Sequence, residues 1–464
     1  MSSPSGPEPI TLEHFMPDHF EHGHSKQANF LNADDLIAGS DICVQCGLCL
    51  SVCPTYEHTG EEIQSPRGRV MLYRAAAEGL TKDYEVVLEA AYDCLDCRAC
   101  QTVCPSGVKP GEMSVETRIA LQDGKVPAGH LGLKLTLEVF KRPWAMDVLN
   151  FGVRTYQVTG LQKFVRHSKI LEKFGAPGKK LAELENICPA KVAPAMRLRT
   201  APVTPAIGEQ RGRVAFFLGC LMNAFYSEAS SATLKVLTLN GFEVVTPRDT
   251  TCCGAPHIEE GDREGFDQVV KRNLDLYDSL DVDAIITDCA GCGAELKKYV
   301  KYYKDDPEYA AKAERFSSKS YGISEFLKKQ GLRGLPEGTL EKVGAGSSVT
   351  YQDACHLCHG QSICNQPREL LKENPTVEYR ELENASDCCG GGGIYNITHP
   401  EMSAKILAGK MERVRDTGAQ ILSVENPGCM LQLEAGVRTY GVDVEVLHTS
   451  QILERAYREA GKSK

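Results

Sequence analysis

The sequence predicts a multidomain α+β protein, in which a helical domain with two cysteine runs precedes two copies of an α/β domain with parallel strands. Three observations support this fold class. Cysteines recur at the same spacing in two runs near the N-terminus, and a pattern of strand, helix and cysteine occurs twice in the C-terminal half. No apolar segment approaches the roughly 20 residues that a membrane-spanning helix needs. The length of 464 residues suits roughly three domains of about 150 residues each.

The N-terminal domain, residues 41–125, contains two runs with the spacing C-x-x-C-x-x-C-x-x-x-C-P. In the ferredoxin pattern, three thiolates of one run bind a [4Fe–4S] cluster and the fourth cysteine binds the other cluster. The first cubane site is therefore predicted to consist of Cys43, Cys46, Cys49 and Cys104. The second cubane site is predicted to consist of Cys53, Cys94, Cys97 and Cys100. We expect a helical ferredoxin-like domain with two clusters.

Zinc and disulfide bonds are the alternatives for these runs. Structural zinc is usually bound by separated C-x-x-C pairs, whereas each run here places four cysteines together. Disulfides in the runs would need an oxidising compartment, and nothing in the sequence indicates one. The pattern therefore favours two iron–sulfur clusters.

The segment between the runs is predicted to form a helical hairpin. Pro66 suits the first turn of a helix, and Tyr84 and Val87 fall at helical spacing in a second segment. Arg67 and Arg69 follow Pro66. They could offset the negative charge of a cluster or dock a partner, or they could simply begin a solvated helix.

Two further regions carry weaker signals. Residues 1–40 are polar and contain four histidines, which favours a mobile arm over a metal site; they are His14, His19, His22 and His24. Residues 126–213 are predicted to form a helical segment and then a Pro-rich linker that crosses between domains. We assign Trp144 to packing within a core or between domains. The lone Cys188 is interpreted as an inert cysteine.

The C-terminal half contains a duplicated domain, at residues 214–330 and 345–464. Each copy begins with an apolar strand that ends at a cysteine, and a Cys-Cys-Gly sequence follows after 31 residues in the first copy and 32 in the second. The first cysteine set is Cys220, Cys252, Cys253, Cys289 and Cys292. The second cysteine set is Cys355, Cys388, Cys389 and Cys429. Alternating strands and helices predict a parallel doubly wound sheet, and ligands collect at the carboxyl ends of such strands.

Glycines and histidines accompany these cysteines. Gly254 and the glycines at residues 390–393 would let the backbone turn close to a bulky inorganic group. The second glycine group could instead hold a phosphate, although it lacks the spacing of a dinucleotide or P-loop motif. His257, His356 and His359 would donate hydrogen bonds to metal ligands, or they are ordinary polar neighbours of the cysteines.

The combination of motifs resembles a heterodisulfide reductase-related family. That family includes the glycolate oxidase iron–sulfur subunit, the catalytic subunit of heterodisulfide reductase, lactate-utilisation proteins and the iron–sulfur subunit of anaerobic glycerol-phosphate dehydrogenase. Pro-Arg-Gly-Arg at residues 66–69, Cys-His-Leu at 355–357 and Asn-Pro-Gly-Cys-x-Leu-Gln at 426–432 are most similar to the glycolate oxidase subunit. The resemblance covers about residues 41–125 and 214–455.

The resemblance implies an electron-transfer subunit of a glycolate-type 2-hydroxy-acid dehydrogenase complex that is inactive alone. A flavoprotein partner with FAD would oxidise the acid, and this chain would pass electrons toward a quinone or another membrane acceptor. In the disulfide reductase relatives, a complete set of five cysteines holds a noncubane cluster, and the first cysteine set is complete. Asn426 replaces one cysteine in the second, where Cys358 and Cys364 are possible substitutes. Three alternatives remain. The chain could catalyse disulfide reduction at a noncubane cluster, it could act in lactate utilisation, or it could be a cluster carrier or redox sensor.

Composition limits the partners. A net charge of −10 argues against nucleic acid as a partner. The N-terminal residues lack the basic and apolar regions of a secretory signal, so we expect a soluble cytoplasmic protein. Such a protein could still be peripheral at the inner face of a membrane through its partners.

Overall fold

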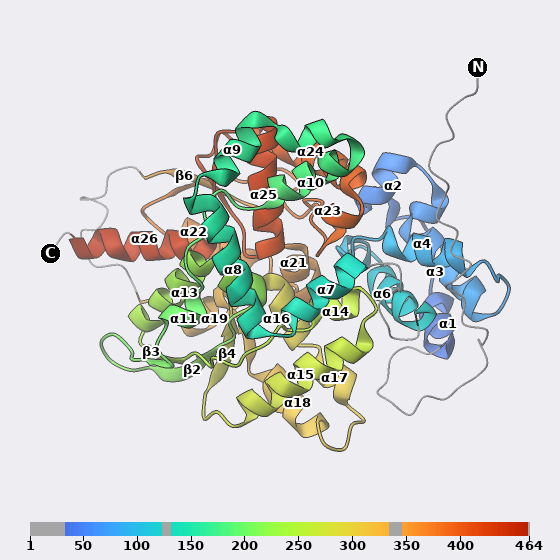
Figure 1. The fold of residues 1–464 in the computed structure, drawn as a ribbon. Helices are drawn as coiled ribbons and strands as arrows, with labels where there is room; N and C mark the ends of the chain where they lie inside the picture. The colour runs from blue at the N-terminus through green and yellow to red at the C-terminus, as the bar shows by residue number, and fades with distance from the viewer. Residues whose placement is uncertain (1–32, 123–130, 334–345, 463–464) are drawn as a thin grey trace.

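The computed structural model describes residues 33–122, 131–333 and 346–462. The N-terminal helices, drawn in blue in Figure 1, lie beside two α/β units, and the C-terminal helix lies on the far side of the molecule. The histidines of the N-terminal arm fall outside the described residues. Within the described ranges, no helix is both long enough and apolar enough to cross a bilayer.

The two helices expected between the cysteine runs are present, after a shorter helix α2 (Pro54–Thr59). Helix α3 (Pro66–Ala77) begins at Pro66, and the Ser65 side chain caps it by accepting a hydrogen bond from the Gly68 N–H. Helix α4 (Tyr84–Tyr92) is capped in the same way by Asp83. Helix α6 (Pro110–Leu121) packs against both. The apolar side chains enclosed by the three helices form a small core, which includes Val70, Tyr73, Val87 and Met113.

Further helices connect this domain to the α/β units. They are α7 (Leu131–Phe140), α8 (Pro143–Val158), α9 (Leu161–Ser168) and α10 (Gly175–Ile187). Helix α10 lies within the stretch that the sequence indicated as a Pro-rich linker, and Pro177 falls in its first turn, where proline is tolerated. The assignment of Trp144 to core packing is wrong, because 61% of this residue is exposed.

The first α/β unit is built on a five-stranded sheet with the order β1-β3-β2-β4-β5. Its strands are β1 (Val203–Thr204), β2 (Gly212–Phe216), β3 (Phe242–Val245), β4 (Ala284–Thr287) and β5 (Ser320–Gly322). Strands β2 to β5 are parallel, which confirms the predicted parallel sheet, whereas β1 pairs antiparallel with β3. Cys220 and Cys289 each lie just beyond a strand, where α12 (Cys220–Phe225) and α16 (Ala290–Leu296) begin.

The second unit repeats this arrangement with four parallel strands in the order β7-β6-β8-β9. Its strands are β6 (Ser348–Tyr351), β7 (Glu378–Tyr379), β8 (Ile421–Ser423) and β9 (Glu445–Leu447). Cys355 begins α21 (Cys355–Gln361) after β6. Cys429 lies in the first turn of α25 (Pro427–Tyr440) after β8. The motif cysteines that follow strands thus lie at the carboxyl ends of those strands in both units.

The two units share one apolar core. The C-terminal helix α26 (Thr449–Lys462) of the second unit packs on α13 (Ser227–Leu239) of the first, as Figure 1 shows. Thr233 Oγ1 donates a hydrogen bond to Ser450 Oγ at 2.8 Å. Leu453 of α26 is buried in the same cluster as Phe216 of β2. Helix α26 therefore completes the apolar core of the first unit.

Candidate metal centres

The two cysteine runs share an unusual backbone. In each run, the residues on either side of the second cysteine have positive φ: Gln45 at 53° and Gly47 at 82° in the first, Asp96 at 46° and Arg98 at 64° in the second. This left-handed conformation is uncommon for residues other than glycine, so tertiary contacts must hold it in place. Gly47 was the only one of the four with a sequence signal for such a turn.

Cysteines of the first cubane site come together from both runs. Burial raises the pKa of the Cys49 thiol, the Arg67 backbone opposes this with a hydrogen bond, and the neighbouring thiols of Cys43 and Cys104 raise the pKa further. Cys104, from the second run, thus lies beside cysteines of the first. Cys46 is exposed, and Cys43, Cys49 and Cys104 are partly buried. This geometry is compatible with the prediction that the fourth cysteine of each run binds the cluster held by the other run.

Cysteines of the second cubane site also come together. Burial raises the pKa of Cys100 well above its usual value, and the nearby thiols of Cys94 and Cys53 add to the effect. Arg69 lies 3.9 Å from Cys53 Sγ through Nη1 and is only 2% exposed. Arg67, in contrast, forms a surface ion pair with Glu62 at 2.7 Å. Of these two arginines, Arg69 is the one placed to offset negative charge at the site.

Sulfur atoms of the first cysteine set form a continuous group. Cys220 Sγ lies 3.7 Å from Cys252 Sγ. Hydrogen bonds from Cys252 and Cys292 lower the pKa of the Cys253 thiol well below its usual value. The Cys292 N–H donates to Cys289 Sγ at 3.3 Å. Five thiols from three segments of the chain therefore converge where the strands end.

A buried histidine stands beside this set. His257 is fully buried, and its Nδ1 lies 2.8 Å from Asp262 Oδ2. Its Nε2 has no hydrogen-bond partner among the described residues, and its proximity contributes to the lowered pKa of Cys253. Gly254 has φ of 91°, and a Cβ there would lie 2.6 Å from the Phe266 ring. A buried ring nitrogen without a partner next to several thiols leaves a polar atom that a group bound at the first cysteine set could contact.

The second cysteine set repeats this geometry with four thiols. Hydrogen bonds from Cys388 and Cys429 lower the pKa of Cys389, as Cys252 and Cys292 do for Cys253. Gly391 passes close to this thiol, because a Cβ at that residue would lie 3.4 Å from Cys389 Sγ. The close passage of Gly391 beside Cys389 matches the expected backbone turn next to an inorganic group.

Asn426 occupies the position of the missing fifth cysteine and bridges the two sets. Its Nδ2 donates to Cys429 Sγ at 3.4 Å, while its Oδ1 lies 3.7 Å from Cys289 Sγ of the first set. The same Oδ1 accepts from the Gly291 N–H at 3.2 Å. The two cysteine sets therefore meet at one amide side chain.

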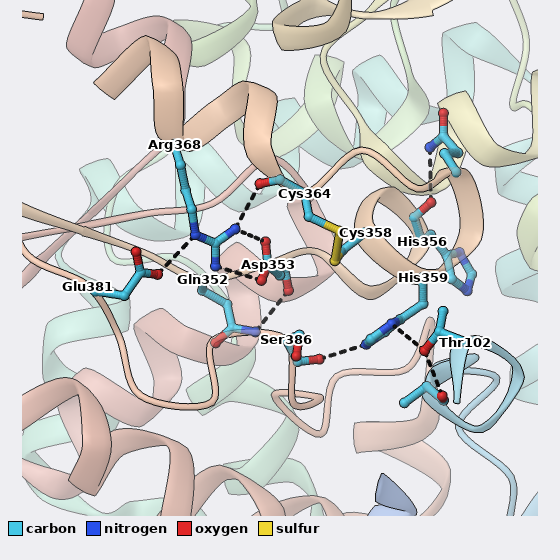
Figure 2. The surroundings of a disulfide bond; sticks show 12 residues. Thr102, Gln352, Asp353, His356, Cys358, His359, Cys364, Arg368, Glu381 and Ser386 are labelled. Carbon is cyan, nitrogen blue, oxygen red and sulfur yellow. Dashed lines mark hydrogen bonds and ion pairs between the residues drawn. A yellow bond between two sulfur atoms is a disulfide. The ribbon is translucent and has the colours of Figure 1, made fainter. Parts of the chain in front are cut away.

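The possible substitute ligands Cys358 and Cys364 are bonded to each other. They form a disulfide with Cα atoms 4.5 Å apart, and Figure 2 shows it beside Arg368 and Asp353. The expectation that these two thiols could replace the missing ligand is therefore wrong for the disulfide state. This disulfide was not expected, because nothing in the sequence indicates an oxidising compartment.

The second cysteine set also adjoins the second cubane site. Cys97 and Cys355 pack around the same small apolar cluster, and the Cys355 thiol contributes to the raised pKa of Cys97, after the larger effect of burial. Figure 2 shows His359 between the two domains, with Nδ1 3.3 Å from Thr102 Oγ1 and Nε2 3.0 Å from the Ser386 backbone oxygen. His359 therefore joins the two domains beside their cysteines.

Buried charges fill the junction between the domains. Although burial opposes it, the Arg98 guanidinium holds the pKa of the Asp96 carboxyl well below its usual value, and the two side chains form an ion pair at 2.9 Å. His356 Nε2 lies 2.9 Å from the Asp96 backbone oxygen. Burial raises the pKa of nearby Glu259 to about 7. Sequence reasoning identified His356 but missed Asp96, Arg98 and Glu259, which belong to no motif.

The donor set at these sites fits iron–sulfur clusters. All the convergent ligands are thiols, which are the soft donors that iron–sulfur clusters use. Arg69 places a positive charge next to them, and His257 places a ring nitrogen that has no partner among the described residues. Cys188 lies apart from this pattern at the end of α10, where its backbone oxygen accepts from Arg166 Nη2 at 2.7 Å.

Comparison with known proteins gives matches along most of the chain. Residues 39–108 match the 4Fe-4S dicluster domain family, and residues 214–297 and 349–434 match the cysteine-rich domain family. Residues 132–188 match the linker region of the glycolate oxidase iron-sulfur subunit.

Among curated relatives, the probable glycolate oxidase iron-sulfur subunit of Bacillus subtilis strain 168 is 38% identical over 421 residues, covering 89% of this chain and 93% of the relative. The glycolate oxidase iron-sulfur subunit of Escherichia coli K12 is 26% identical over 440 residues, covering 93% and 97%. Lactate utilization protein A of Shouchella clausii is 29% identical over 242 residues, covering 52% and 98%. With its dicluster domain, its two cysteine-rich domains and relatives of nearly the same length, the chain belongs to the family of glycolate oxidase iron–sulfur subunits.

Proposed function

We propose that this chain is the electron-transfer subunit of a flavin-dependent 2-hydroxy-acid dehydrogenase complex of the glycolate type. The observation that supports the proposal is that thiols of the N-terminal domain lie beside the second cysteine set, and that Asn426 joins this set to the first. We also propose the domain division given by the sequence, with boundaries near residues 41, 126, 214 and 345. The protein would be cytoplasmic and inactive without a flavoprotein partner, whose FAD would accept electrons from the substrate.

The proposed ligand assignments are those of the cysteine spacing, and the proximity of several of these thiols supports them. Cys43, Cys46, Cys49 and Cys104 would hold one [4Fe–4S] cluster, and Cys53, Cys94, Cys97 and Cys100 a second. The first cysteine set would hold a noncubane cluster, and the second set a further site with four thiols. Clusters bound there supply one-electron transfer. The protein fixes their spacing, excludes water from buried thiols such as Cys253, and places Arg69 beside the second cubane site.

The order of the sites suggests a route for electrons. The first cubane site lies at the surface, where the neighbouring Val44 is 70% exposed and Leu48 is 55% exposed. These side chains offer an apolar contact for the flavoprotein at the point of entry. The second cubane site, the second cysteine set and the first cysteine set follow in sequence through Cys97, Cys355 and Asn426. A quinone would accept electrons at the far end.

Reconstitution tests this function. The chain would be purified anaerobically, alone and with its flavoprotein partner, and iron and acid-labile sulfide would be measured together with dye reduction by glycolate and lactate. We expect about eight irons from the two cubane sites, and more if the first cysteine set is filled. Cluster reduction should require both the flavoprotein and a 2-hydroxy acid.

Matched variants sharpen this test. Cys46→Ser should remove one cubane and abolish electron transfer, while Cys188→Ser, outside every cysteine group, should retain iron and turnover. Turnover of a 2-hydroxy acid by the single chain would contradict the assigned role. So would zinc in place of iron.

Reduction of a disulfide substrate at the first cysteine set is the second candidate. It is favoured by the five thiols of that set and by the partial exposure of Cys220 beside a small cavity that also includes Pro143, Met146 and Cys252. Disulfide-dependent oxidation of the reduced protein would support this candidate. Electron transfer from the flavoprotein to a quinone, without any effect of added disulfides, would exclude it.

A further inference from the structure

Helix α8 carries an apolar stripe that faces away from the protein. Trp144, Val148, Phe151 and Val158 are 61%, 60%, 68% and 82% exposed. Their spacings of four, three and seven residues place them on one face of the helix. The orientation of α8 is fixed from its other side, where buried Asn150 donates to the backbone oxygens of Ala193 and Ala224 at 2.9 and 2.7 Å. The stripe is therefore held outward.

Exposed apolar side chains also occur in the next two α-helices of the chain. In α9, which contacts α8, Leu161 and Phe164 are 50% and 58% exposed, while Gln162 is buried. Phe174 and Leu181, at and after the start of α10, are 68% and 53% exposed. Figure 1 shows α8 and α9 as neighbouring surface helices. Exposed apolar side chains on three consecutive helices exceed what isolated surface residues would explain.

Positive charge accompanies these apolar side chains. Residues 132–188 contain ten Lys or Arg and five Asp or Glu residues, a net charge of +5 in a chain whose total is −10. Lys163, Lys169, Lys173 and Lys179 are exposed, and none of them forms an ion pair with a described residue. The excess positive charge is thus available to an outside partner.

We propose that the α8–α10 face, defined as the exposed apolar and lysine side chains of residues 144–181, rests on the surface of an anionic lipid bilayer. Interfacial helices combine an apolar face containing Trp, Phe and Leu with Lys and Arg beside it. Tryptophan is favoured at the level of the lipid headgroups. A protein partner is the weaker candidate, because lysine is depleted in the core of protein interfaces.

The α8–α10 face lies close to the first cysteine set, so docking on a bilayer would also orient that set. Helix α8 packs on α12, which begins at Cys220, and the cavity beside Cys220 is lined by Pro143 and Met146 of α8. Docking would hold the first cysteine set toward the bilayer. That consequence rests on the proposed electron-transfer function, whereas the docking itself does not.

Vesicle binding tests the docking without the flavoprotein or any electron transfer. The anaerobically purified protein would be mixed with vesicles of phosphatidylcholine, with or without phosphatidylglycerol, and separated by flotation. We expect binding to the anionic vesicles that weakens as salt is raised. Trp144 is the only tryptophan, so its emission should shift to shorter wavelength and be quenched by brominated lipids.

Two sets of substitutions separate the apolar and the charged contributions. Val148→Ser with Phe151→Ser and Val158→Ser keeps Trp144 as the reporter and should weaken binding by about tenfold or more. Lys163→Gln with Lys169→Gln and Lys173→Gln should weaken it by about fivefold per lysine on anionic vesicles. Leu80→Ser removes another apolar side chain, 76% exposed between α3 and α4, and should leave binding unchanged. Iron content and circular dichroism verify folding.

Several results would overturn the proposal. Absence of binding to anionic vesicles is the first, and binding without any change in Trp144 emission is the second. Equal loss of binding in the Leu80→Ser control is a third. If the apolar substitutions release the flavoprotein subunit while vesicle binding stays intact, the face is a protein interface instead.

Discussion

Asn426 Oδ1 lies 3.7 Å from Cys289 Sγ, across the boundary between the two duplicated units. The residue that replaces a cysteine in one unit thus contacts the equivalent cysteine of the other. Its Nδ2 donates to Cys429 at 3.4 Å, so one amide serves both cysteine sets. A short backbone contact supports this arrangement, since the Ala290 N–H donates to the Glu425 oxygen at 2.8 Å.

We predict that Asn426→Asp lowers the reduction potentials of the species bound by both cysteine sets. The substitution puts a negative charge beside Cys289 and Cys429, which makes the addition of an electron less favourable. A shift on the order of tens of millivolts is expected in a redox titration followed by EPR. Asn186→Asp serves as the control, because its amide contacts Thr439 instead. A shift confined to one species would show that Asn426 does not couple the two sets.

Arg69 should raise the potential of the second cubane site. Arg69→Gln removes a buried positive charge 3.9 Å from Cys53 Sγ, so the potential should fall by tens of millivolts, while Arg69→Lys should retain most of it. Arg67→Gln is the matched control, since Arg67 is paired with Glu62 at the surface. EPR-monitored titration of the three variants decides this. Equal shifts in Arg67→Gln and Arg69→Gln would contradict a local effect.

The Cys358–Cys364 disulfide predicts that neither residue binds iron. Cys358→Ser should leave iron content unchanged and release one additional thiol, Cys364, for alkylation under denaturing conditions without reductant. Cys355→Ser, three residues away on the same helix, should lose iron from the second cysteine set. Iron loss in Cys358→Ser comparable to that in Cys355→Ser would show that the pair supplies ligands.

His448 should make stability sensitive to acid. It is fully buried, donates from Nε2 to the Asp288 oxygen at 2.9 Å and accepts at Nδ1 from the Ser450 N–H at 3.1 Å, and burial lowers its pKa to about 4. The unfolded chain would take up this proton near pH 6.5, so stability is present above that pH and is lost as pH falls toward 4. Between pH 7.5 and 5.5 the loss is about 1.4 kcal/mol.

Denaturant unfolding at the two pH values, followed by circular dichroism, measures this loss. His448→Gln should reduce the pH dependence by that amount, whatever its effect on overall stability. His58→Gln, which changes an exposed histidine, should keep the parental dependence. An unchanged dependence in His448→Gln would contradict the assignment.

Sequence patterns predicted those strands and helices that depend on residues close together in the chain. The strand at Ser348–Tyr351 and the helix at Pro66–Ala77 were recognised because apolar runs, prolines and capping residues lie within a few positions of each other. The cysteine spacings predicted the thiols of the two sets for the same reason. The two-residue strand Glu378–Tyr379 was not recognised, since its existence depends on pairing with β6 and not on its own residues.

Contacts between distant residues explain the rest of what was missed. His356 and Asp96 are separated by 260 positions, and Asn426 and Cys289 by 137, so no local pattern could pair them. Trp144 was assigned to packing within a core or between domains because the spacing of an apolar stripe is the same whether protein covers it or not. Only the packing of Asn150 on the opposite side of α8 determines that the stripe faces outward.

The position of α26 on the first unit bears on how the protein is made. A ribosome synthesises the first cysteine set long before it reaches Leu453, yet Leu453 completes the apolar core behind β2. Part of the core of the nascent first unit therefore stays uncovered until α26 has been synthesised. We therefore expect iron and sulfide to enter at Cys220 and its partners only after α26 is in place, and a chain cut before Leu453 to bind them poorly even though every motif cysteine is present.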